Sequence, residues 1–74
     1  MKTYQNQIEE FGHEMADDII KREKDPTWES PLKKMDICSS ISKIYDVEYR
    51  TVIDDLDKQI TKSIKIIRAR MYAR

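Results

Sequence analysis

The sequence predicts a small all-α domain of three helices, the last one longest, with a helix-turn-helix-like junction between the second and third. Two observations favour this fold class. The 74 residues include one glycine and two prolines, so few positions suit turns. The apolar residues recur at spacings of three and four positions, which place them on one face of a helix. Because a chain of this length forms one domain at most, we assign residues 1–74 to a single helical domain.

The first predicted helix covers residues 3–24. One face of it carries five apolar side chains, Tyr4, Ile8, Phe11, Met15 and Ile19. Gly12 interrupts the pattern, and a glycine inside a helix costs about 1 kcal/mol relative to alanine. We expect the helix to end before Asp25, since the residue preceding a proline avoids the helical conformation. Residues 25–30 then form the connecting loop.

The second predicted helix covers residues 31–45 and the third covers residues 47–72. Ser30 before Pro31 is typical of a helix start. Serine caps the free N–H groups of the first turn, and the first helical position needs no N–H, which proline lacks. Asp46 is the predicted N-cap of the third helix. The apolar residues of the third helix recur every 3.6 positions on average, which is the period of a straight helix rather than of a coiled coil. At 1.5 Å per residue this helix would be about 39 Å long, so we expect its far end to pack on another copy or a different protein.

Charge is distributed unevenly along the chain, although the net charge at pH 7 is zero. Residues 1–57 contain all fourteen acids and eight of the bases, whereas residues 58–74 contain six bases and no acid. Such asymmetry indicates a nucleic acid, a membrane or an acidic protein as the partner of the basic end.

The basic end supplies most of the candidate contacts for a nucleic acid or an acidic partner. These contacts are Arg50, Lys58, Lys62, Lys65, Arg68 and Arg70. On a helical wheel the three lysines fall opposite the isoleucines of the third helix, and the last two arginines fall on the flanks. A plainer explanation also stays open, because bases near a helix C-terminus stabilise it through the helix dipole.

The junction between the second and third helices has the outline of a DNA-binding helix-turn-helix, whose second helix enters the major groove. Two features argue against this interpretation. Asp46 occupies the turn position usually held by glycine. The acids Glu48, Asp54 and Asp55 would repel phosphates on the exposed side of the reading helix.

An acidic face on the first helix, formed by Glu10, Glu14 and Asp17, is complementary in sign to the basic end. Within one molecule or across a dimer, the two would attract each other and orient the helices. An interfacial membrane helix also combines an apolar stripe with bases. Here the stripe continues without a break from the residues expected in the core, so we do not expect membrane binding.

The candidate residues for a protein interface are Trp28, Ile60, Ile64, Ile67 and Met71. The last four belong to the part of the third helix that we expect to be exposed and to mediate a homodimer. Trp28 lies in the loop between two prolines and has two possible roles. It either caps the core or, if exposed, is a hot-spot residue of the interface.

No catalytic, metal or cofactor site is expected. His13, the sole histidine, begins a near match to the His-Glu-x-x-His zinc motif, but Asp17 stands where the second histidine would be. Cys38 would need His13 as a base to act as a nucleophile. Its place on the apolar stripe of the second helix predicts a buried thiol instead. We therefore do not expect a small-molecule substrate either.

These observations favour a small non-enzymatic protein–protein interaction or regulatory module that forms a homodimer. The alternative is a helix-turn-helix-like nucleic-acid-binding regulator that uses the basic C-terminal helix. A cytoplasmic location is expected, because a lone cysteine suits a reducing compartment. The sequence also shows no secretory signal and no apolar run of about 20 residues.

Overall fold

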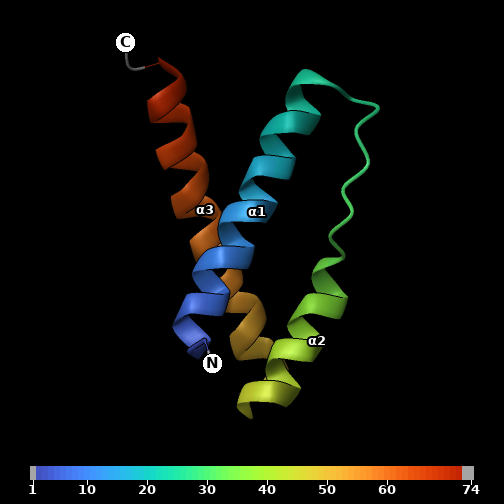
Figure 1. Cartoon of the computed structure of the whole chain (residues 1–74), viewed down its shortest axis with the longest axis vertical. Helices are drawn as coiled ribbons and strands as arrows, with labels where there is room; N and C mark the ends of the chain where they lie inside the picture. Colours follow the sequence, from blue (N-terminus) through green and yellow to red (C-terminus); the bar gives the residue numbers. More distant parts are fainter. Residues whose placement is uncertain (1, 73–74) are drawn as a thin grey trace.

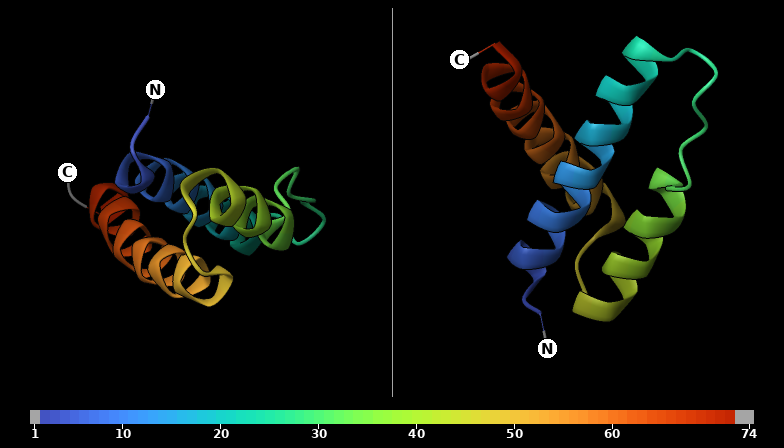
Figure 2. Two further views of the ribbon diagram at one scale, coloured as in Figure 1. Left: turned by 90° about the horizontal axis from the view of Figure 1, so that it is seen from below. Right: turned by 45° about the horizontal axis from the view of Figure 1, so that its top comes forward.

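The computed structural model describes residues 2–72, which form three helices and, within that range, no strand. The helices are α1 (Tyr4–Lys24), α2 (Lys34–Tyr45) and α3 (Tyr49–Tyr72). α1 and α3 run side by side in the same direction, and α2 returns beside their lower halves in the opposite direction (Figure 1). The upper ends of α1 and α3 lie apart, as the right view of Figure 2 also shows. The all-α fold predicted from the sequence is confirmed.

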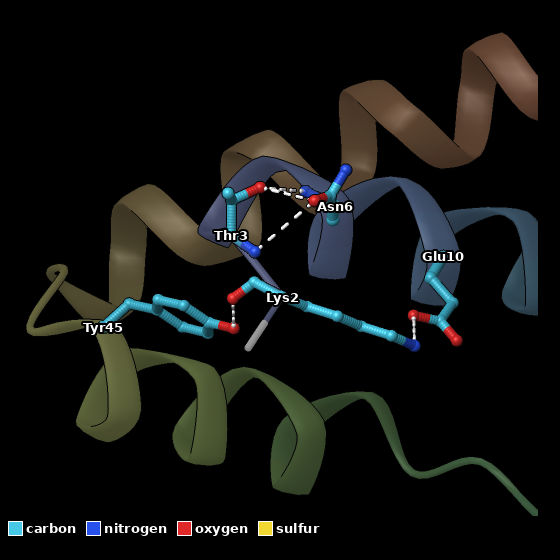
Figure 3. A network of polar contacts seen from close by, with 5 residues as sticks. All are labelled: Lys2, Thr3, Asn6, Glu10 and Tyr45. Carbon is cyan, nitrogen blue, oxygen red and sulfur yellow. Dashed lines mark hydrogen bonds and ion pairs between the residues drawn. The ribbon is translucent and has the colours of Figure 1, made fainter.

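The start of α1 is set by Thr3 and Asn6 (Figure 3). Thr3 Oγ1 accepts a hydrogen bond from the backbone N–H of Asn6 at 3.1 Å, and Asn6 Oδ1 accepts one from the backbone N–H of Thr3 at 3.4 Å. This reciprocal pair is a capping box, which satisfies two N–H groups that the first turn leaves without partners. At the other end, Asp25 is extended, with a φ of −133°, as expected of a residue before proline.

α2 begins at Lys34 rather than at residue 31, so the predicted start of the second helix is wrong. Ser30 does not cap the helix, because its hydroxyl donates a hydrogen bond to Asp18 Oδ2 of α1 at 2.5 Å. The same oxygen accepts a bond from the backbone N–H of Leu32 at 3.1 Å. Lys33 occupies the N-cap position, and its side chain makes no capping hydrogen bond. A tertiary contact with α1 thus replaces the local cap.

Asp46 ends α2 and does not cap α3, contrary to the prediction. It adopts the left-handed conformation (φ 54°, ψ 48°), and its backbone N–H donates to the carbonyl oxygen of Ser42. A short polar aspartate tolerates this conformation better than most residues do. The Ser42 hydroxyl donates to the carbonyl oxygen of Val47 at 2.6 Å. These bonds close the turn, and α3 begins at Tyr49.

The core lies where α1 crosses α3, with α2 packed on one side. Its buried apolar residues are Ile8, Met15, Cys38, Ile41, Val52 and Leu56. The closest approach is at Gly12, where an added Cβ atom would lie 2.4 Å from Cγ and 2.8 Å from Cβ of Gln59. One turn further along each helix, the small residues Ala16 and Ser63 are fully buried. Small side chains on both helices therefore let the two backbones come close at this level.

Polar contacts of two tyrosines hold the lower ends of the three helices together. Tyr4 of α1 donates a hydrogen bond to Asp55 Oδ2 of α3 at 2.7 Å. Burial, followed by this bond, raises the pKa of Tyr4. Tyr45 of α2 donates to the carbonyl oxygen of Lys2 at 2.7 Å (Figure 3). The two tyrosine rings meet edge to face, with their centres 5.9 Å apart.

Replacing Gly12 by alanine should destabilise the fold, although the same change in an exposed helix would stabilise it by about 1 kcal/mol. The added methyl group meets atoms close to the Gln59 backbone, and overpacking of this kind costs about 1–3 kcal/mol. We expect a net loss of roughly 1 kcal/mol in the free energy of unfolding, measured by urea denaturation. Adding Gln59→Ala should cost less than the sum of the two single changes, because Cγ is then absent. A Gly12→Ala variant more stable than the wild type would contradict the close approach.

Candidate interaction surfaces

A buried carboxylate anchors the connector between α1 and α2. Asp18, which is 8% exposed, accepts hydrogen bonds from Ser30 Oγ at 2.5 Å and from Trp28 Nε1 at 3.3 Å. Lys21 Nζ lies 5.1 Å from the centre of the Trp28 ring, within range of a cation–π contact. Trp28 is half-buried against α1, which fits a cap on the core better than a projecting hot-spot residue. Sequence reasoning missed Asp18, although its place three residues after Met15 put it beside the apolar face.

An apolar strip runs along the upper half of α3. Four of its residues come from α3 and one comes from α1: Ile60, Ile64, Ile67, Met71 and Ile19. The three isoleucines of α3 are half-buried, and Met71 and Ile19 are each 37% exposed. Ile19 and Ile60 also line a groove of about 300 Å³. The ion pair between Lys34 and Asp57 also lines this groove and marks the upper end of α2. Above this level no third helix covers α3 (Figure 1).

The far end of α3 is less free than its length suggested. Although the upper ends of α1 and α3 lie apart, Glu23 near the end of α1 forms an ion pair with Arg68. Contacts within the chain therefore cover part of the surface that the length argument assigned to a partner. Met71 and Tyr72 stay accessible, with exposed fractions of 37% and 82%. The homodimer itself stays a prediction.

A second apolar groove, which sequence reasoning missed, lies between α2 and the start of α3. Its space of about 320 Å³ is lined mainly by Met35, Cys38, Tyr49 and Ile53. Met35 is 74% exposed, although periodicity placed it on the apolar face of the second helix. Cys38 is fully buried, as its position predicted, and burial raises the pKa of its thiol.

The basic candidates do not all lie on one surface. Three lysines, all exposed, form what we term the basic triad: Lys58, Lys62 and Lys65. Among residues 2–72, no acid lies within ion-pair distance of the triad. Arg68 is bound to α1 through Glu23, and Arg70 lines a groove between α1 and α3. Arg50 is exposed at the start of α3, whereas Arg74 lies outside the described residues.

The acidic face of the first helix is an exposed group on α1, which we term the acidic triad: Glu10, Glu14 and Asp17. None of the three pairs with α3 within the described residues, and Glu10 binds Lys2 Nζ at 2.5 Å instead (Figure 3). A groove of about 660 Å³ lies between α1 and α3. Its lining includes Glu9, Glu10 and His13 from α1, and Lys62, Ile66 and Arg70 from α3. Lys2, which pairs with Glu10, also lines this groove, so its α1 side carries both charges and its α3 side is basic. Glu14 and Asp17 line a different groove, beside Trp28 and Pro31 of the connector.

The near match to the zinc motif lies on the outer surface of α1. His13 and Asp17 are both exposed there. Among residues 2–72, no three His, Cys, Asp or Glu side chains are grouped so as to hold a metal ion. The lack of catalysis stays a prediction from the sequence.

Comparison with protein families, with curated proteins and with solved structures found no match for this chain. Within the described range, no helix combines the length and the apolarity that crossing a lipid bilayer requires. What the protein does therefore has to be inferred from its own surfaces.

Replacing Asp18 by alanine should loosen the connector, because Trp28 Nε1 and Ser30 Oγ lose their acceptor. We expect the free energy of unfolding to fall by about 1–3 kcal/mol and the tryptophan fluorescence to shift to longer wavelength. Glu29→Ala is the matched control, since Glu29 is an exposed acid in the same connector. Its effect should stay within about 0.5 kcal/mol. Equal effects of the two changes would show that Asp18 does not anchor the connector.

Proposed function

We propose that this chain is a non-enzymatic protein–protein interaction or regulatory module that works as a homodimer. The observation that most supports an interaction module is the apolar strip on the upper half of α3. Single apolar side chains are normal on a protein surface, whereas a contiguous group rimmed by charges is typical of an interaction site. A cytoplasmic location belongs to the same proposal.

The strip suits a helix of a partner protein. Its members recur every three or four residues along α3, and Ile19 of α1 shares a groove with Ile60. A partner helix with apolar residues at the same spacing would pack there as a third helix, above the level that α2 reaches. Charged side chains at the edge of the groove, among them Arg22, Lys34 and Asp57, would flank that helix.

A photoreactive residue placed at position 71 should cross-link a partner protein in the cells that produce this chain, because Met71 lies at the exposed end of the strip. Position 44 is the matched control, since Ile44 is 63% exposed and lies on α2, away from the strip. We expect an adduct that forms from position 71 only and is lost when Ile67 is also changed to Asp. Equal labelling from both positions, or none from position 71, would contradict this role of the strip.

A nucleic-acid-binding regulator is the second candidate function. It is supported by the exposed basic triad, which has no acid partner within residues 2–72. The turn adds support, because Asp46 takes the left-handed conformation that glycine usually supplies between the two helices. Glu9 and Glu10 weaken this candidate, since they line the same groove as Lys62 and would repel phosphates bound there.

Fluorescence anisotropy of a labelled DNA duplex separates the two functions. Nucleic-acid binding should be micromolar at low salt and fall steeply as salt is raised, because each neutralised phosphate releases counterions. It should also be lost on Lys62→Ala and kept on Lys43→Ala, an exposed lysine of α2. The interaction module should not bind the duplex even at low salt.

A further inference from the structure

We propose that this chain binds single-stranded nucleic acid along the outer side of α3. The site is a row of exposed residues that we term the basic ridge: Lys58, Lys62, Lys65, Ala69 and Tyr72. This inference rests on the second candidate function and names its ligand and its site. The three lysines bind phosphates of one strand, and the ring of Tyr72 stacks on a base.

The basic ridge is one row on one helix. Its members are separated by four, three, four and three positions, a spacing that places them on the same side of α3. At 1.5 Å per residue the row is about 21 Å long, and the small side chain of Ala69 leaves it open between Lys65 and Tyr72. Asp54 lies on the same side four positions before Lys58. The track for phosphates therefore begins at Lys58 and runs toward the end of α3.

Two acids beside the lysines are held by other groups. Asp55, less than one turn before the first lysine, accepts a hydrogen bond from the Tyr4 hydroxyl at 2.7 Å. Glu10, which lines a groove with Lys62, pairs with Lys2 Nζ at 2.5 Å. No acid of residues 2–72 forms an ion pair with a lysine of the ridge. These lysines are therefore available to neutralise phosphates, which release counterions when they are bound.

Tyr72 adds an aromatic surface to the row of charges. It is 82% exposed, and α1 does not cover it because the upper ends of α1 and α3 lie apart (Figure 1). Proteins that bind single strands combine basic side chains, which follow the backbone, with aromatic rings on which bases stack. Since every base has a face that can stack, such a site tolerates many sequences. The position of Tyr72 at the end of the lysine row matches this combination.

A single strand fits the ridge better than a duplex does. The bases of a duplex are already stacked on one another, so Tyr72 could contact a base face only after that base had been unstacked. A duplex also carries a second row of phosphates, whereas the ridge is a single row. Glu9 and Glu10 line the groove on the α1 side of Lys62 and would repel phosphates there. An acidic protein would satisfy the lysines but would offer no base to Tyr72.

The basic ridge and the apolar strip lie on different sides of α3. On a helical wheel the lysines fall opposite the isoleucines, and both surfaces belong to the upper half of the helix. A partner helix on the strip would therefore leave the ridge open. The chain would then link a partner protein to a single strand.

Fluorescence anisotropy with three labelled probes tests this site. The probes are oligo-dT and oligo-U strands of about 12 nucleotides, within the range of known single-strand sites, and a DNA duplex of the same length. We expect at least one of the single strands to bind about tenfold or more tightly than the duplex, because only an unpaired base stacks on Tyr72. This binding should weaken as salt is raised.

Four variants separate stacking from charge. Tyr72→Ala should weaken single-strand binding about fivefold or more, the loss expected for stacking on one base, and should leave duplex binding unchanged. Tyr72→Phe is the matched control, since it keeps the ring. Lys62→Ala should reduce the salt dependence of single-strand binding by about 0.7 in logarithmic slope, whereas Lys43→Ala, an exposed lysine of α2, should not. Circular dichroism checks that each variant is folded.

The contrary results differ in what they overturn. A duplex that binds as tightly as both single strands, or a Tyr72→Ala variant that binds them as the wild type does, would overturn this inference and leave a nucleic-acid-binding regulator standing. No binding of any probe, even at low salt, would overturn the second candidate function as well. That result would leave the interaction module standing, because the module depends on the apolar strip.

Discussion

The close approach of α1 and α3 at Gly12 is the constraint on which the rest of the structure depends. Because Gly12 has no side chain, Gln59 packs against the backbone of α1. Ala16 and Ser63 continue the contact with small buried side chains one turn further on. This crossing sets the register of α1 along α3, and with it which side chains of the two helices lie side by side. α2 adds its own apolar residues to the core but covers only the lower half of the pair.

The crossing gives the molecule two faces of different chemistry. On one side, α2 and the connector pack against α1 and α3. Above the level that α2 reaches, apolar side chains of this side are exposed. Asp18 keeps the connector on that side by binding Trp28 and Ser30. On the other side, α1 and α3 form a groove to which α2 contributes nothing, with Glu9 and Glu10 on α1 and Lys62 and Arg70 on α3. We propose the first face as the docking surface for a partner helix.

The helices could be predicted from the sequence because apolar periodicity is a local property, whereas the features that place them depend on distant residues. Ser30 has the local signal of an N-cap, but the carboxylate of Asp18 takes its hydroxyl. Asp46 suits either end of a helix, and only the turn geometry shows that it ends α2. Taken by itself, Gly12 only weakens the first helix, and the structure is needed to show that Gln59 packs against it. The members of both triads are visible in the sequence, but the grooves that they line are not: Glu10 lies beside Lys62, whereas Glu14 and Asp17 lie beside the connector.

The most direct test of this account is a nuclear Overhauser measurement on the α-protons of Gly12. We expect their strongest contacts outside α1 to be to the β- and γ-protons of Gln59, within the same chain. A register shifted by one helical turn would instead give the strongest contacts to Leu56 or Ser63, and would displace α1 relative to α3 by about 5 Å along the helix. That result would contradict the crossing at Gly12 and the arrangement of the two surfaces that depends on it.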